Sequence, residues 1–127
     1  MKILEVCAVD FTLYHFLVPL IEGFTARGHE VIGACSDGAN ARQVRARGVR
    51  VEPVPFSRRM GAVRQHIRAY HILCALLRKE SFDIVHVHTP MAAALGRLAA
   101  WRTGVPTIVY TAHGFHFHEY MKFWNRV

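Results

Sequence analysis

Histidines follow two apolar segments of the chain, and they are the side chains best suited to chemistry. His86 and His88 alternate within residues 83–90, and His113 comes directly after the apolar run 106–111. Alternation at a period of two places His86 and His88 on the same face of a strand. A helical run separates the two segments, so together they predict one βαβ unit with a histidine at the end of each strand. Open parallel α/β sheets bind ligands at the carboxyl ends of their strands, so this edge is the predicted site.

The position of each histidine suggests a different role. His88 lies at the end of its strand, directly before Thr89, and this position favours a catalytic or ligand-binding role. His86 lies deeper in the strand and is more typical of a packed, hydrogen-bonded histidine. Imidazoles also suit zinc, and the alternative ligand set is His88, His113, His116 and His118. No cysteine or carboxylate joins them at a recognised zinc spacing, so we expect no metal.

The turn after the first strand offers a second group of polar side chains. It lacks the G-x-G-x-x-G fingerprint, and no phosphate loop of the P-loop type is present in the chain. The turn instead carries Asp10, Thr12, Tyr14 and His15, next to a helix N-terminus that favours anions. Taken alone, this pattern is more typical of a polar loop and a helix cap than of a binding site.

Strands and helices alternate along the chain that positions these residues. Near-continuous apolar runs predict strands over 2–8, 31–35, 49–54, 82–87 and 106–111. Helical spacing predicts helices over 16–27, 36–47, 63–77 and 90–102. This order predicts a Rossmann-like three-layer sandwich, α/β, with a mostly parallel sheet, helices on both faces and right-handed crossovers.

Several local features refine this prediction. Pro19 should kink the first helix or mark an early turn. Ser36 or Asp37 should cap the second helix, and Thr89 should cap the fourth with Pro90 in its first turn. The third helix carries one apolar stripe, which we expect to face the core: Val63, Ile67, Tyr70, Cys74 and Leu77. Glu5 interrupts the first apolar strand, and the sequence gives no reason for it.

Composition indicates a single globular domain with a basic surface. The chain has 127 residues, of which 52% are hydrophobic and 11% aromatic. Its net charge of +7 comes from 16 basic and 9 acidic residues and favours an anionic partner. Nucleic acid, acidic lipid head groups and phosphorylated substrates all have that chemistry. The arginines that we expect to face a membrane or another anion are Arg58, Arg59, Arg64 and Arg68.

The N-terminus and the cysteines favour a cytoplasmic protein. Glu5 interrupts the first apolar segment and no small-residue cleavage site follows, so a signal peptide is not predicted. No apolar run reaches the roughly 18 residues that a membrane span requires. Cys7, Cys35 and Cys74 are far apart in apolar segments, which favours buried free thiols.

Four segments together resemble family 4 glycosyltransferases, most of all the bacterial branch that builds capsular and exopolysaccharide glycans on lipid carriers. They are Lys2-Ile3-Leu4, Gly28-His29-Glu30-Val31, the run from Phe82 to Pro90 that contains His-Val-His-Thr-Pro, and Thr111-Ala112-His113-Gly114-Phe115-His116. The resemblance implies the N-terminal, acceptor-side half of a GT-B enzyme. It implies retaining transfer of a sugar from a nucleotide-sugar, expected to be a UDP-sugar, to a polyprenyl-diphosphate-linked saccharide. It implies no metal and no cofactor.

The same resemblance assigns roles to individual residues. His88 matches the active-site histidine, His113 and Gly114 match the loop after the fifth strand, and the Asp10–His15 turn matches the loop near the donor phosphates and acceptor. The C-terminal donor-binding domain and its Glu-x7-Glu motif are missing from this sequence. We therefore expect this single domain, residues 1–127, to be inactive alone and to lie peripherally on the inner face of the plasma membrane.

Other functions stay open at this point. The chain could be a non-catalytic subunit that docks to a separate donor-binding subunit through its aromatic tail. Nucleic-acid binding would also use the basic surface, but no motif with interleaved aromatics is present, so no nucleic-acid partner is expected. A metal-binding protein is the remaining alternative.

Overall fold

The protein folds around one parallel sheet, seen in a computed structural model that describes residues 1–57, 59 and 61–111. The strands are β1 (Lys2–Val6), β2 (Glu30–Cys35), β3 (Arg50–Pro53), β4 (Ile84–His88) and β5 (Thr107–Thr111). The helices are α1 (Asp10–Thr12), the π-helical segment η1 (Leu13–Leu17), α2 (Val18–Ala26), α3 (Ala39–Ala46), α4 (Val63–Lys79) and α5 (Pro90–Thr103). The strand order is β3-β2-β1-β4-β5, and every neighbouring pair is parallel. The predicted Rossmann-like sandwich is confirmed.

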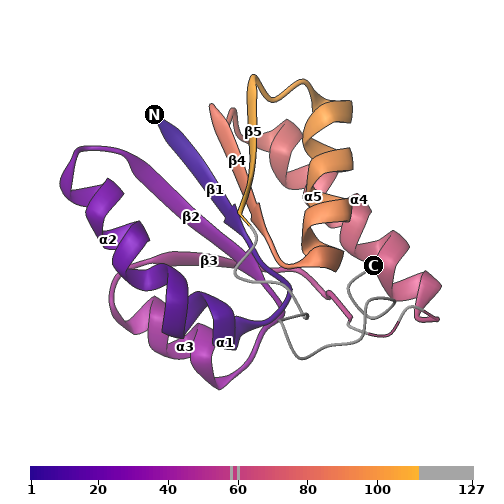
Figure 1. Ribbon diagram of the computed structural model, residues 1–127, viewed down its shortest axis with the longest axis horizontal. Helices are drawn as coiled ribbons and strands as arrows, with labels where there is room; N and C mark the ends of the chain where they lie inside the picture. The colour runs from indigo at the N-terminus through magenta and orange to yellow at the C-terminus, as the bar shows by residue number, and fades with distance from the viewer. Residues whose placement is uncertain (58, 60, 112–127) are drawn as a thin grey trace, which may run out of the picture.

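Helices cover both faces of the sheet and produce two separate cores. Side chains of α4 and α5 pack on one face, against Leu4, Val6, Val85 and Val87. On the other face, η1, α2 and α3 pack against Ile3, Cys7 and the strands β2 and β3. Figure 1 shows the two layers, with α1, α2 and α3 on one side of the sheet and α4 and α5 on the other. Glu5 in β1 is two residues from both Ile3 and Cys7 and therefore faces the same side of the sheet as the second core.

The first helix is divided at Pro19, as its sequence predicts. A π-helical turn over Leu13–Leu17 precedes α2, which begins at Val18 with the proline in its first turn. Proline has no N–H to donate to the preceding turn, and the helical turn before it is widened to π-helical geometry. The helix ends before Gly28, whose φ of +88° is the left-handed conformation that glycine adopts at low cost.

Two predicted helix caps differ from the structure. Gly38, and not Ser36 or Asp37, stands before α3, and the Asp10 carboxylate from α1 accepts the N–H of Ala41 at 3.1 Å. Thr89 stands before α5 as predicted, but its hydroxyl oxygen accepts the N–H of Ala8 at 3.3 Å and does not cap the helix. In both cases a contact distant in sequence replaces the local cap.

The predicted apolar stripe of α4 is only partly buried. Cys74 and Leu77 lie in the core, whereas Val63 is 59% exposed and Ile67 is 51% exposed. The helix has 17 residues and so is about 25 Å long. A strand of 5 residues such as β4 spans only roughly 17 Å. The first turns of α4 therefore project past the carboxyl ends of the described strands, which together form the carboxyl edge of the sheet.

The strand β5 forms one edge of the sheet and is open to solvent. Ile108, Val109 and Tyr110 are 37%, 40% and 45% exposed, although they belong to an apolar strand. The opposite edge is β3, as its prolines predict. The three cysteines are buried and free, which agrees with the prediction. Among the described residues, no helix has the length and hydropathy that crossing a membrane requires.

Candidate functional site at the carboxyl edge of the sheet

A buried carboxylate and two histidines meet where β1 and β4 end. The Oε2 atom of Glu5 lies 2.6 Å from Nε2 of His88 and 3.0 Å from Nδ1 of His86, and its Oε1 lies 3.1 Å from the same Nδ1. The centroids of the two imidazole rings are 4.0 Å apart. Glu5 is 0% exposed and His88 is 1% exposed, so the bond between them is buried, whereas the bond to His86, whose side chain is 14% exposed, is partly buried.

Strand register brings these three side chains together. Glu5 in β1 is paired with His86 in β4, and His88 is paired with Thr111 in β5. Paired residues of parallel strands point to the same face, so the four side chains share one face of the sheet. The hydroxyl oxygen of Thr111 lies 2.6 Å from Nε2 of His86. A continuous hydrogen-bonded chain, His88–Glu5–His86–Thr111, thus crosses three strands at their carboxyl ends.

Glu5 carries its charge despite this burial. Burial alone would raise its pKa, but the hydrogen bonds with His86 and His88 outweigh that effect and hold the pKa of Glu5 below its ordinary value. An ionised carboxylate can only accept hydrogen bonds, so Nδ1 of His86 and Nε2 of His88 must each donate. The carboxylate therefore determines which nitrogen of each ring carries a proton.

The turn that follows His88 has an unusual backbone. Thr89 has a φ of 68° and a ψ of 146°, a region that a β-branched residue rarely adopts. The N–H of Ala8, just past β1, donates to its hydroxyl, and its carbonyl accepts the N–H of Ala93 to start α5. Contacts from both sides thus hold the strained turn in place beside the histidines.

Glu5, His86 and His88 have donor types that suit a metal. Their ligand atoms all lie within 4.8 Å of one another. Two ligands of one tetrahedral zinc, each about 2.0–2.1 Å from the metal, would lie roughly 3.3 Å apart. The 2.6 Å between Glu5 and His88 is instead a hydrogen-bond distance, so in this conformation the donors bind one another. His113, His116 and His118, which completed the alternative zinc ligand set, lie outside the described residues.

The four polar residues predicted in the turn after β1 have different surroundings in the structure. Asp10 caps α3, as described above. Tyr14 is half-buried against the second core, with the guanidinium of Arg47 5.8 Å from its ring centroid. Thr12 is half-buried, and His15 is exposed with its ring 4.2 Å from that of Phe11. Of this group, Asp10 and Tyr14 have evident structural partners, and His15 is the one most accessible to a ligand.

The predicted basic surface lies at the start of α4. Arg59, Arg64 and Arg68 are exposed, in the same segment as the exposed Val63 and Ile67. Arg58 lies outside the described residues, as do His113 and Gly114. Because β3 ends at the carboxyl edge, the start of α4 lies at that edge too (Figure 1).

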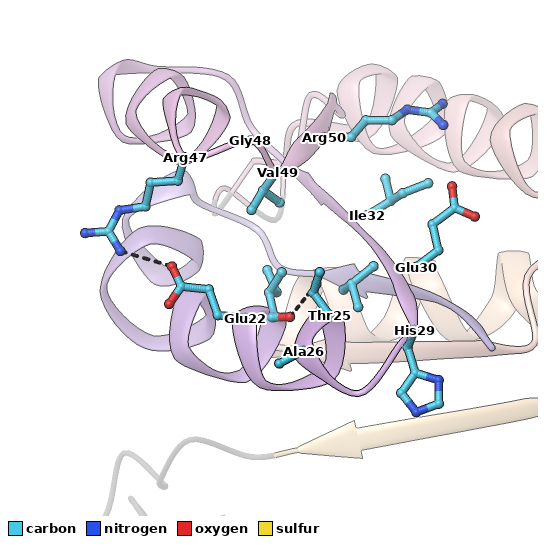
Figure 2. A pocket seen from close by; sticks show the side chains of 12 residues that line it. Glu22, Thr25, Ala26, His29, Glu30, Ile32, Arg47, Gly48, Val49 and Arg50 are labelled. Carbon is cyan, nitrogen blue, oxygen red and sulfur yellow. Dashed lines mark hydrogen bonds and ion pairs between the residues drawn. The ribbon is translucent and has the colours of Figure 1, made fainter.

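A surface groove of about 640 Å³ lies at the other end of the strands, where their amino ends form the amino edge of the sheet. It runs between the end of α2, the start of β2 and the turn from α3 to β3. Figure 2 shows Glu22 and Arg47 at one end of it and His29, Glu30 and Arg50 at the other. Glu22 and Arg47 pair with each other at 3.2 Å, and Arg50 pairs with Glu80 of the α4–β4 turn. These charges satisfy one another, so the groove does not present a converging set of unpaired groups to a ligand.

Glu5 belongs to the site but was not predicted as a site residue from the sequence. Its signal was present as the one charge inside a buried strand, because a buried carboxylate requires partners that supply hydrogen bonds. The partners lie 81 and 83 residues away, and the strand order that joins them is not visible in a local pattern.

Comparison with known proteins agrees with this architecture. The fold resembles that of Anabaena Alr3699/HepE in complex with UDP and glucose, with a TM-score of 0.71 at 19% identity over 98% of this chain and 33% of that one. A glycosyltransferase from Rickettsia africae ESF-5 has a TM-score of 0.72 at 16% identity, over 94% of this chain and 31% of that one. At these identities the likeness establishes the fold alone.

Sequence relatives are more specific. EpsD of Bacillus subtilis (strain 168), which carries the name of a glycosyltransferase, is 33% identical over 119 residues, 91% of this chain and 30% of the relative. The Escherichia coli UDP-Gal:alpha-D-GlcNAc-diphosphoundecaprenol alpha-1,3-galactosyltransferase is 51% identical over 47 residues, 37% of this chain and 12% of that enzyme. The chain thus spans less than a third of either relative.

A family model describes most of the chain directly. The model of the glycosyl transferase 4-like domain matches residues 16–127. This range contains α2 to β5 and both histidines of the site. Together with the GT-B type of Rossmann fold, the match confirms the family that the His-Val-His-Thr-Pro segment predicted, and the chain belongs to the glycosyl transferase 4-like domain family.

Proposed function

We propose that this chain is the acceptor-side domain of a retaining glycosyltransferase that moves a sugar from a UDP-sugar to a polyprenyl-diphosphate-linked saccharide. The observation that carries the proposal is the relationship to the Escherichia coli galactosyltransferase, whose name specifies both a UDP-sugar and a diphosphoundecaprenol-linked acceptor. EpsD supports the same class of reaction over nearly the whole chain. Since the chain covers 30% of EpsD, donor binding is assigned to a further domain or subunit.

The proposed reaction uses the carboxyl edge of the sheet. His88 is the proposed catalytic residue, with His15 and Thr12 of the first turn and the predicted His113 and Gly114 on the acceptor side. His88 is 1% exposed, so a sugar reaches its ring only if the groups that cover it move. No metal or other cofactor is assigned, because the donor is itself the activated substrate.

A ligand titration of the chain tests the acceptor assignment. Isotope-labelled protein would be titrated with a water-soluble, short-chain prenyl-diphosphate N-acetylglucosamine, and separately with UDP-galactose. We expect the lipid-diphosphate saccharide to shift amide signals of Thr12, His15 and Thr89, and UDP-galactose to leave them unchanged. Shifts produced by UDP-galactose alone, or no shifts with the acceptor, would contradict the proposal.

The catalytic assignment is tested in the protein that carries both domains. His88→Ala should reduce turnover of the lipid-linked acceptor and leave the far-ultraviolet circular dichroism spectrum unchanged. Turnover equal to that of the unmodified enzyme would remove the catalytic role from His88.

The start of α4 is proposed to bind the membrane that holds the lipid acceptor. Exposed arginines attract anionic head groups, and each contributes about 1 kcal/mol near such a surface. Val63 and Ile67 add apolar area next to Arg64 and Arg68, as in helices that lie in a membrane interface. Charge and apolar exposure thus coincide at the same edge as the proposed site.

Vesicle sedimentation tests this surface. Binding to vesicles containing phosphatidylglycerol should fall with added salt and should be weak for neutral vesicles. Arg64→Glu with Arg68→Glu should abolish it. Arg78→Glu with Lys79→Glu is the matched control, since it reverses two charges at the other end of the same helix. Equal losses in the two double variants would show that only net charge matters and would exclude a specific surface.

The open strand β5 favours a second candidate function, a non-catalytic subunit that docks to a donor-binding partner. Its exposed apolar side chains, Ile108 and Tyr110 among them, are typical of a surface that another protein covers. Mixing the chain with a separately produced donor-binding domain of this family would test it. A complex that Tyr110→Lys abolishes would support the candidate, and two separate peaks in size-exclusion chromatography would exclude it.

A further inference from the structure

We propose that Glu5 is a positioning residue, which fixes the tautomer and orientation of His88 and His86 at the carboxyl edge of the sheet. Its effect on sugar transfer rests on the proposed function, whereas its effect on the two rings does not. Glu5 does not belong to any of the segments that carried the family resemblance. The assignment depends on its contacts in the fold.

Burial and geometry carry the first step. Glu5 is 0% exposed, and each of its carboxylate oxygens has a histidine nitrogen within 3.1 Å. A carboxylate removed from water is strongly disfavoured unless donors surround it. Two residues away on the same face of β1, the buried side chain is the aliphatic Ile3, so burial in this strand does not by itself require a charge. The charge is therefore tied to the two rings that it holds.

The contacts with Glu5 also determine which ring nitrogens of His86 and His88 are protonated. Two carboxylate oxygens accept two ring protons, so His88 must be protonated at Nε2 and His86 at Nδ1. A histidine whose one nitrogen donates to a carboxylate is fixed in orientation and made more basic at its other nitrogen. Thr111 extends the arrangement to β5, because its hydroxyl lies 2.6 Å from the other nitrogen of His86.

The charged and titratable surroundings of Glu5 are few among the residues that the structure describes. β4 contributes His86 and His88. Cys7 follows directly after β1, and its thiol pKa is raised by its hydrogen bond with Cys35, by burial and by nearby charge that includes Glu5. No lysine or arginine in this part of the chain pairs with Glu5. The two imidazoles are thus the groups that compensate its charge.

Replacement by glutamine gives a sharp test. The amide keeps the shape of the side chain but has one acceptor oxygen and one donor nitrogen in place of two acceptors. The amide nitrogen donates, so a ring nitrogen that faces it is expected to be unprotonated and to accept that hydrogen bond. Long-range ¹H–¹⁵N spectra of the histidine rings report the protonation of each nitrogen, and His86→Gln and His88→Gln assign the signals.

We expect Nε2 of His88 and Nδ1 of His86 to be protonated in the unmodified chain near neutral pH, and one of them to be unprotonated in Glu5→Gln. Glu5→Asp should keep both protons, and Glu30→Gln, an exposed charge at the amino edge, should change neither ring. An unprotonated Nε2 of His88 in the unmodified chain would overturn the proposal. So would unchanged rings in Glu5→Gln, or loss of both ring protons on addition of one equivalent of zinc.

A second measurement connects the position of the rings to the reaction. In the protein that carries both domains, Glu5→Gln should lower kcat at least tenfold with KM for the acceptor unchanged, and should have no added effect when His88 is already alanine. An equal loss in both backgrounds would make Glu5 a general structural residue. If the histidine spectra behave as expected but the protein transfers no sugar, the proposed function fails and the positioning role stands.

Discussion

At the scale of single residues, Asp10 illustrates how a polar side chain in a promising turn is used for the fold. Its carboxylate accepts the N–H of Ala41, which is the third residue of α3. A Cβ atom on Gly38 would lie 2.5 Å from the same carboxylate oxygen, so the glycine permits this close approach. An acceptor at the start of a helix satisfies an N–H that has no partner within the helix.

Asp10→Ala should therefore reduce the free energy of unfolding by about 1 kcal/mol, the usual cost of losing a cap. Asp37→Ala is the control, because Asp37 was one of the two caps expected from sequence but is exposed and pairs with Arg45 at 2.8 Å. Such an exposed pair contributes under about 1 kcal/mol. Urea denaturation monitored by circular dichroism compares the two, and a larger loss for Asp37→Ala would contradict the assignment of the cap.

At the scale of the elements, α5 lies close to the sheet because Gly96 has no side chain. A Cβ atom at this position would lie 2.7 Å from Cγ1 of Val87, which is a short, branched side chain of β4. Gly96→Ala should therefore push the helix away from β4 and destabilise the protein by about 1–3 kcal/mol, despite the better helix propensity of alanine.

Gly23→Ala is a matched control within another helix. A Cβ atom at Gly23 would meet nothing within 4 Å, so the change should stabilise the protein by about 0.5–1 kcal/mol. Thermal unfolding of the two variants gives the sign of each effect. Stabilisation by Gly96→Ala would mean that the contact with Val87 relaxes without cost.

The elements also show what sequence patterns can and cannot predict. Strand and helix order, the division at Pro19 and the edge position of β3 follow from local periodicity and proline chemistry, and each was predicted correctly. The exposed start of α4 was not, since its apolar spacing continues past the end of the sheet that it covers. The Glu5 contacts were not predicted either, because they depend on which strands become neighbours.

At the scale of the whole molecule, the carboxyl edge and the amino edge of the sheet carry different groups of polar side chains. The carboxyl edge holds the Glu5–His86–His88 cluster and the exposed start of α4. At the amino edge, Glu80 accepts a hydrogen bond from Nζ of Lys2 of β1 at 2.7 Å and from the two terminal guanidinium nitrogens of Arg50 of β3. These ion pairs connect a central strand, an edge strand and the end of α4. The pairs with Arg50 and then Lys2 lower the pKa of Glu80 from 4.5 to about 2.

The sign of the resulting pH dependence follows from that shift. A carboxyl group with a lowered pKa in the folded state stabilises the protein above its ordinary pKa, and the contribution is lost as the pH falls toward the folded value. Glu80→Gln should therefore cost about 1–2 kcal/mol near neutral pH, with allowance for screening of a surface network. The difference from the unmodified chain should shrink between pH 4.5 and about 2.

Because the Glu80→Gln change is at the amino edge, the ring spectra of His86 and His88 should stay as they are. Urea midpoints at several pH values measure the first effect, and a difference that is constant with pH would contradict it. Altered histidine spectra in Glu80→Gln would mean instead that the two edges of the sheet are coupled.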